Sequence, residues 1–152
     1  MSQKIYLVSA CLIGINCRYN GGSSRIPELE SLVDSGRMVP ICPEVLGGLS
    51  TPRKACEIIS QDNGSPKVVT KDGIDCSQEF LVGAQKVLKI CEVCDVDKVI
   101  LKANSPSCGC GLIYDGTFSG RLREGNGLTS QLLIENGIEV YNENNWSSSD
   151  FI

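Results

Sequence analysis

Four short apolar runs, separated by helix-like and turn-like stretches, recur along this chain. They cover residues 5–9, 38–41, 98–101 and 138–141. Each run has four or five residues, which is the length of a buried strand. Between the first two runs, Pro27 and Gly36 mark the start and the end of a short helix. A strand, a helix and a second strand in this order predict parallel strands joined by a crossover.

Two more helices are predicted in the second half of the chain. The first begins near Asp75, which with Gln78 resembles an N-terminal cap, and runs to about Glu92 with one apolar face. The second runs from a cap at Thr129 to a stop at Gly137. Each helix precedes an apolar run, as expected when a helix returns the chain to the start of the next parallel strand.

Two segments break this alternation and are predicted to form hairpins at the edge of the sheet that carries the site. Residues 57–59 and 67–69 flank a turn at 62–64 in the first, and residues 112–114 and 117–119 flank Asp115-Gly116 in the second. We therefore expect an α/β fold. It would be a single Rossmann-like, three-layer domain over residues 1–141 with a small, mainly parallel sheet, followed by a loosely held polar tail over residues 142–152.

Composition and charge narrow the class of protein. With 152 residues, 41% of them hydrophobic and 21% charged, the chain can build one domain with its own core. No apolar run has the length of a membrane span, and residues 1–4 lead into a strand and not into a signal peptide. We therefore expect a cytoplasmic protein without a membrane partner. A net charge of −4 argues against nucleic acid as a partner, and the absence of histidine excludes a His-based catalytic triad and any His-ligated metal site.

Three of the nine cysteines lie just beyond apolar runs, in phrases rich in turn residues. They are Cys11, Cys42 and Cys108. If the three preceding strands are parallel neighbours, these cysteines meet at one edge of the sheet, where open α/β folds place their sites. Three soft thiolates at one point indicate an iron–sulfur cluster or another thiophilic metal. With only three protein thiolates, one iron of a four-iron cluster has no cysteine ligand.

The remaining cysteines are Cys17, Cys56, Cys76, Cys91, Cys94 and Cys110. Cys91 and Cys94 form a C-x-x-C, but at the C-terminal end of a predicted helix, where the helix dipole does not favour a thiolate, so we interpret them as structural. Cys56, Cys76 and Cys110 show no spacing to a partner and are also interpreted as buried structural residues. Cys17 is left open as a reserve thiol, a pocket wall or a disulfide partner.

Six phrases around these residues resemble the thiouracil desulfidase family of microbial proteins. They are residues 8–14 (VSACLIG), 17–22 (CRYNGG), 39–49 (VPICPEVLGGL), 51–53 (TPR), 100–109 (ILKANSPSCG) and 113–120 (IYDGTFSG). The resemblance implies a Rossmann-like domain that holds a 4Fe–4S cluster through Cys11, Cys42 and Cys108, with one open iron. It also implies catalytic roles for Glu44 and Ser105.

The resulting hypothesis is a non-redox desulfuration of a thiolated nucleobase or nucleoside, such as 4-thiouracil, to the oxo base and sulfide. The open iron would bind the thiocarbonyl sulfur, Glu44 would act as general base, and Ser105 would hydrogen-bond the ring or relay a proton. Two alternatives remain: a sulfur carrier for nucleoside thiolation with the same ligands, and a non-enzymatic metal- or redox-sensing module. The sequence leaves open the roles of Arg53 and Lys102, the preferred substrate and the oligomeric state.

Overall fold

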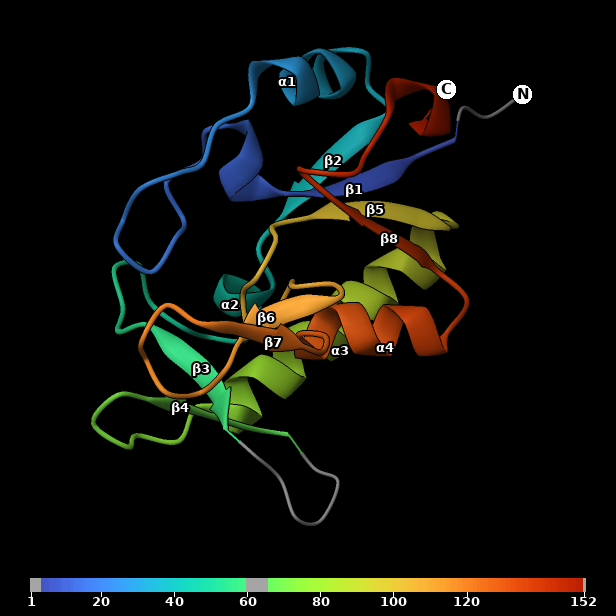
Figure 1. Ribbon diagram of the computed structural model, residues 1–152. Coiled ribbons are helices and arrows are strands. Elements are labelled where there is room, and N and C mark those ends of the chain that lie inside the picture. Colours follow the sequence, from blue (N-terminus) through green and yellow to red (C-terminus); the bar gives the residue numbers. More distant parts are fainter. Residues whose placement is uncertain (1–3, 60–65, 152) are drawn as a thin grey trace.

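A four-stranded parallel sheet forms the centre of the computed structural model, which describes residues 4–59 and 66–151 (Figure 1). Its strand order is β2-β1-β5-β8. The strands are β1 (Tyr6–Ser9), β2 (Met38–Ile41), β5 (Lys98–Leu101) and β8 (Glu139–Asn142). All four predicted runs are strands of this sheet, so the mixed α/β fold with a parallel sheet is confirmed.

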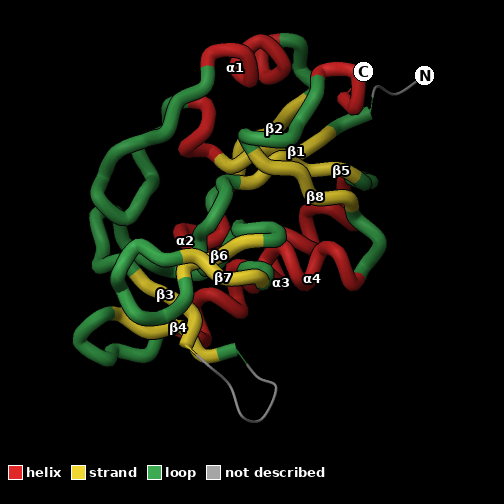
Figure 2. Tube along the Cα trace, in the orientation of Figure 1, coloured by secondary structure: helices red, strands yellow, loops and turns green. Residues whose placement is uncertain are grey.

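Helices pack against both faces of the sheet (Figures 1 and 2). Neighbouring residues of a strand point to opposite faces, so Tyr6 and Val8 lie in one core and Leu7 in the other. The first core holds the 3-10 helix η1 (Ala10–Ile13) and α1 (Pro27–Asp34), and the second holds α3 (Ser77–Cys94) and α4 (Leu128–Glu135). Within the described residues, no helix is both long and apolar enough to cross a bilayer.

Two hairpins lie below the sheet in Figure 1. In the first, β3 (Cys56–Ile59) pairs with β4 (Lys67–Thr70), as predicted, and the predicted turn at 62–64 lies outside the described residues. In the second, β6 (Leu112–Tyr114) pairs with β7 (Leu122–Glu124). The predicted strand at 117–119 is therefore wrong. The amides of Gly116 and Phe118 donate to the Glu57 carboxylate on β3 and not to a ladder with β6.

The start of α4 also differs from the prediction. Gly127 is the N-cap residue, and Thr129 lies inside the helix with its side chain fully buried. Its hydroxyl bonds to that of Ser107 at 2.9 Å, so it does not cap the helix. Instead, the amides of Leu128 and Thr129 donate to the carbonyl oxygens of Pro106 and Ser107, both at 2.9 Å. The start of α4 therefore holds the loop that follows β5.

The helix α3 begins one residue later than the predicted cap suggests and ends later as well. Its N-cap residue is Cys76, and the Asp75 carboxylate accepts a bond from the Ser77 amide at 2.8 Å. At the other end the helix continues beyond Glu92 to Cys94. The apolar face is as predicted, since Phe80 is buried together with the inward residues of the following turns.

The C-terminal segment is not loosely held, which corrects the prediction. Its last described element is the 3-10 helix η2 (Ser148–Phe151). Phe151 is fully buried, and its ring packs edge-on against Tyr6 and Tyr141, with centroids 5.0 and 5.4 Å away. The tail is polar in composition, but one aromatic side chain anchors it in the first core.

Replacing Phe151 with alanine is expected to lower the free energy of unfolding by about 3–5 kcal/mol, because a buried ring is lost and a cavity remains. Urea unfolding followed by circular dichroism measures this change. Asn144→Ala, at an exposed position of the same segment, is the control and should change the stability by less than about 0.5 kcal/mol. Equal effects of the two variants would contradict the anchoring role.

Candidate functional site

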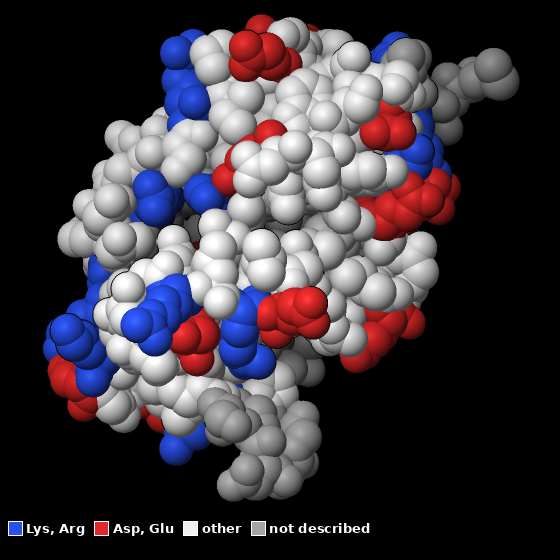
Figure 3. Space-filling model, viewed as in Figure 1, with Lys and Arg blue, Asp and Glu red and all other residues white. Residues whose placement is uncertain are grey.

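A cavity of about 770 Å³ opens where β2, β1 and β5 end, between the sheet and the two hairpins. On the face shown in Figure 3, lysine and arginine side chains lie at the edge of a hollow between these parts. Cys11, Cys42 and Cys108 all line the cavity. The predicted convergence of these residues at one edge of the sheet is confirmed, whereas their function as ligands stays a prediction.

Local structure sets the positions of Cys11 and Cys42. Cys11 lies in η1, directly after β1, and Cys42 is the N-cap residue of the short helix α2 (Pro43–Leu46). Two glycines allow α2 to lie directly on α3. A Cβ atom at Gly47 would stand 1.9 Å from a carbonyl oxygen of α3, and one at Gly83 would stand 2.1 Å from a carbonyl oxygen of α2. This close contact fixes α2, and with it Cys42, beside the cavity.

Three serines hold Cys108 in place. The Cys108 amide donates to Ser105 Oγ at 2.7 Å, Ser130 Oγ donates to the Cys108 carbonyl at 2.6 Å, and Ser9 Oγ donates to Cys108 Sγ over 3.7 Å. Burial is the main cause that raises the pKa of the Cys108 thiol above its ordinary value, and the nearby Glu44 adds to it. A thiol in this setting gives up its proton when a cation binds it.

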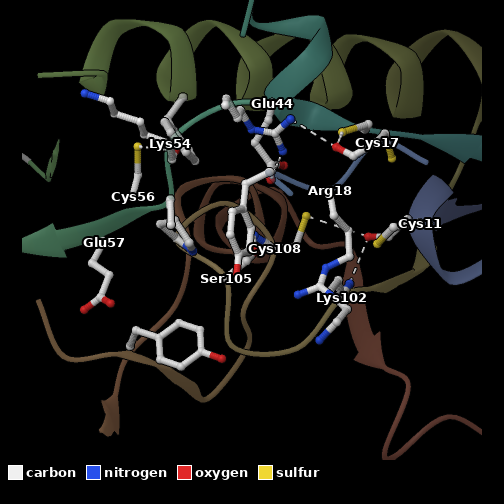
Figure 4. A pocket seen from close by; sticks show the side chains of 18 of the residues that line it. Cys11, Cys17, Arg18, Glu44, Lys54, Cys56, Glu57, Lys102, Ser105 and Cys108 are labelled. Carbon is white, nitrogen blue, oxygen red and sulfur yellow. Dashed lines mark hydrogen bonds and ion pairs between the residues drawn. The ribbon is translucent and has the colours of Figure 1, made fainter. Parts of the chain in front are cut away.

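Cys17 is a fourth thiol in the same wall. It is 8% exposed and lines the cavity, and Figure 4 shows it at the same end as Cys11 and Cys108. A hydrogen bond with Cys11 is the main cause that raises the pKa of Cys17 to about 11, and a bond from Cys17 raises the pKa of Cys42. All nine cysteines are free. Of the roles that the sequence left open, the pocket wall is the one observed.

The donor set is compatible with an iron–sulfur cluster. Among residues 4–59 and 66–151, no group of three or more His, Cys, Asp or Glu side chains is arranged to hold one metal ion. The thiols instead line a cavity far larger than an ion, and a cubane of four irons and four sulfides spans a wider separation of thiolates than one ion does. Soft sulfur donors without histidine also match iron–sulfur chemistry.

Glu44 lies in the first turn of α2, and Arg53 holds its carboxylate. The Arg53 Nη2 atom donates to Glu44 Oε2 at 3.2 Å, and the two side chains are only 9% and 16% exposed. Arg53 Nη1 also donates to the Cys17 carbonyl at 3.0 Å. Within the described part of the chain, Glu44 Oε1 has no hydrogen-bond partner, so this oxygen is available to a ligand.

Replacing Arg53 with methionine is expected to lower the free energy of unfolding by about 2 kcal/mol, because the largely buried Glu44 carboxylate loses its charged hydrogen-bond partner. The matched control is Arg25→Met, which breaks the exposed pair of Arg25 with Glu30. That change should cost less than about 1 kcal/mol. Urea unfolding of both variants measures the difference, and an equal loss would contradict the account of Arg53 as a buried anchor.

Ser105 also lines the cavity, in the loop after β5. Because its oxygen accepts the Cys108 amide, its hydroxyl proton remains available to a ligand. One role of Ser105 is therefore structural, since it shapes the turn that carries Cys108. The second role, contact with a substrate, stays a prediction.

The cavity is basic, although the chain is acidic. Five basic residues line it, against three acidic ones, in a protein with a net charge of −4. One of the basic residues is Lys102, whose Nζ atom donates to Glu143 Oε2 at 2.9 Å. Glu143 Oε1 accepts the Ala103 amide at 2.7 Å, which ties the loop after β5 to the C-terminal segment. Surplus positive charge suits a cluster that three thiolates make negative.

The other cysteines divide into two pairs and Cys110, which is half-buried outside the cavity wall and donates to the Val140 carbonyl over 3.9 Å. Cys91 is 1% exposed in the second core and Cys94 is exposed, both at the end of α3 and outside the cavity wall, as interpreted from the sequence. Cys56 and Cys76 are neighbours, which the sequence did not indicate. Burial, together with Cys76, raises the pKa of Cys56 to about 12. Cys56 lines the cavity at the end away from Cys11 (Figure 4).

Three comparisons bear on the identity of this site. A family model described as 2-thiouracil desulfurase matches residues 6–145. The uncharacterised protein YbbK of Bacillus subtilis (strain 168) is 48% identical over 143 residues, which cover 91% of this chain and 95% of YbbK. The structure of TudS, a 4Fe–4S-dependent thiouracil desulfidase, is similar with a TM-score of 0.86 and 42% identity, over 93% of this chain and 92% of that chain.

Proposed function

Because the chain belongs to the 2-thiouracil desulfurase family, we propose that it is an iron–sulfur enzyme that exchanges the sulfur of a thiolated uracil for oxygen. Water and the thiocarbonyl compound give the oxo base and hydrogen sulfide, with no net electron transfer. The observation that carries the proposal is the convergence of three thiols from the ends of three neighbouring strands in one cavity.

In this proposal Cys11, Cys42 and Cys108 hold the cluster. When bound, the cluster supplies a Lewis acid for the thiocarbonyl sulfur, at the iron that no cysteine ligates. Cys17 lines the wall beside these residues and is not assigned as a ligand. The serine contacts of Cys108 and the packing of α2 on α3 hold two of the three thiols before the cluster binds.

The residues of the chain supply the proton chemistry. Glu44 Oε1 takes a proton from water as the water oxygen attacks the thiocarbonyl carbon, and it returns the proton as hydrogen sulfide leaves. Arg53 orients the carboxylate by donating a hydrogen bond to Oε2, and Oε1 then faces the ligand. Ser105 donates its hydroxyl proton to a polar atom of the ring. The chain has no histidine, and three carboxylates line the wall. Glu57 accepts two backbone amides and Asp72 pairs with Lys54, so Glu44, two residues from Cys42, is the one assigned as the base.

Turnover of 4-thiouracil and 2-thiouracil by anaerobically reconstituted protein tests the proposal. Sulfide and uracil should appear in equal amounts, without added reductant or oxidant. If the protein holds the cluster but converts neither compound, the proposed enzymatic activity is contradicted and the sulfur-carrier alternative is favoured. The two compounds also differ in the position of their sulfur, so their relative rates show which ring orientation the cavity accepts.

We also propose two finer statements about the protein. The fold is Rossmann-like with three layers, which is supported by α1 on one face of the sheet and by α3 and α4 on the other. The small thiolated base is the expected partner, in a cytoplasmic location that remains a prediction.

The strand order, in which β1 lies between β2 and β5, puts a change of winding direction at the cavity, where such folds bind ligands.

A further inference from the structure

The cavity concentrates the aromatic side chains of a chain that has few. The protein has eight aromatic residues, and four of them line the cavity: Tyr19, Phe80, Tyr114 and Phe118. Phe80 is buried, whereas Tyr19 and Tyr114 are 42% and 37% exposed and Phe118 is half-buried. Partly exposed rings at a cavity provide flat apolar surface for a ligand.

Phe118 is held in an uncommon conformation. Its φ angle is +57°, in the left-handed region that bulky residues rarely adopt. Of the three non-glycine residues with positive φ in the described chain, the other two are Asp95 and Asn104. Asp and Asn tolerate this region because their short polar side chains bond locally, but phenylalanine has no such compensation. Conformations of this kind persist only where the surroundings enforce them.

Glu57 on β3 enforces the conformation of Phe118. Its carboxylate is buried, and Oε1 accepts the Gly116 amide at 2.9 Å and the Phe118 amide at 3.1 Å. No lysine or arginine of the described residues pairs with it. The turn also lies against β3, since a Cβ atom at Gly116 would stand 2.7 Å from the Ile58 carbonyl oxygen. The turn that carries Phe118 is therefore positioned by the buried Glu57 carboxylate and by the close contact of Gly116 with β3.

We infer that Phe118 stacks on the ring of the thiolated base and that Glu57 is the positioning residue that holds Phe118 at the cavity. The chemical class of the ligand rests on the proposed function; the placement of the ring rests on the geometry of this turn. Every nucleobase presents a flat π face, so stacking favours planar heterocycles over saturated rings. Phe118 is in this sense a specificity-determining residue.

Phe118→Leu tests the stacking, because leucine keeps the apolar bulk and removes the ring. In the holoenzyme it should raise the KM for 4-thiouracil about tenfold, within the range that one base-aromatic stack provides, while kcat and iron content stay within about twofold. The separate variant Phe118→Tyr, which keeps an aromatic ring, should have the KM of the wild type. An unchanged KM in Phe118→Leu, or a lower kcat at constant KM, would overturn the inference.

Binding separates this inference from the proposed function. Calorimetry compares uracil with 5,6-dihydrouracil, which has the same polar groups on a puckered ring, and Phe118→Leu should lose most of the preference of the wild type for uracil. A wild type without that preference would overturn the stacking, whether or not it converts thiouracil. A wild type that prefers uracil but releases no sulfide would contradict the proposed enzymatic activity and leave the stacking supported.

The pair Glu57→Gln and Glu57→Leu tests the positioning role. Glutamine keeps an oxygen acceptor for both amides and should leave the KM near that of the wild type. Leucine removes the acceptor and should raise the KM as Phe118→Leu does, because the turn no longer holds the ring. If Glu57→Gln raises the KM as much as Glu57→Leu, the charge itself acts on the ligand, and the positioning role is wrong.

Discussion

Replacing Cys108 with serine is expected to abolish cluster binding and turnover together. Serine is similar in shape and can keep the contacts of the backbone with Ser105 and Ser130, so the fold should survive. A serine hydroxyl is a poor ligand for iron in this setting, since it is hard and protonated where a thiolate is soft. Iron and acid-labile sulfide, measured after anaerobic reconstitution, should each fall from about four per chain to less than one.

Two other cysteines sharpen this test. Cys94→Ser changes an exposed thiol outside the cavity and should keep both the cluster and the activity. Cys17→Ser is the more demanding comparison, because Cys17 lies in the same wall in contact with Cys11 and Cys42. It should keep most of the iron. If Cys17→Ser loses the cluster as completely as Cys108→Ser, the assignment of three ligands is wrong and a fourth thiolate takes part.

Replacing Glu44 with glutamine is expected to lower kcat by about 10²–10⁴-fold with the cluster retained, which is the contribution of a well-placed general base. Glutamine has the same shape and can still accept a bond from Arg53, so the wall of the cavity should remain intact. The change removes only the ability of Oε1 to take a proton. Sulfide release under single-turnover conditions, together with the iron content, measures the effect.

Glu92→Gln is the matched control, because it makes the same change at an exposed position of α3. It should leave kcat unchanged. A Glu44→Gln variant with full turnover would remove Glu44 from the proton chemistry. A variant that loses its cluster would show a structural role for Glu44, and the deficit would then say nothing about catalysis.

Local patterns predicted much of the fold. A strand buried on both faces is a continuous apolar run, as β1 is, and all four predicted runs are strands of the parallel sheet. Because β2, β1 and β5 are neighbours, the thiols that follow them meet in one cavity, as expected. The motif phrases likewise predicted the family, which the match over residues 6–145 confirms.

Predictions that depended on long-range contacts were less successful. The segment 117–119 has the composition of a strand, but the amides of Gly116 and Phe118 bond to Glu57, about sixty residues earlier. The tail looked unattached because it is polar, yet Phe151 packs between Tyr6 and Tyr141. No hydrophobic periodicity or turn residue near Phe151 indicates that contact.

By itself, the sequence determined the strands, their parallel arrangement, the three thiols that follow them and the family to which the chain belongs. Only the tertiary structure decided that Arg53 holds one oxygen of Glu44 and leaves the other available, that Cys17 joins the thiol wall, and that Phe118 is held at the cavity. The reason is physical. Strands and turns follow from periodicity over a few residues, whereas contacts between distant side chains depend on how whole elements pack and how loops cross between them.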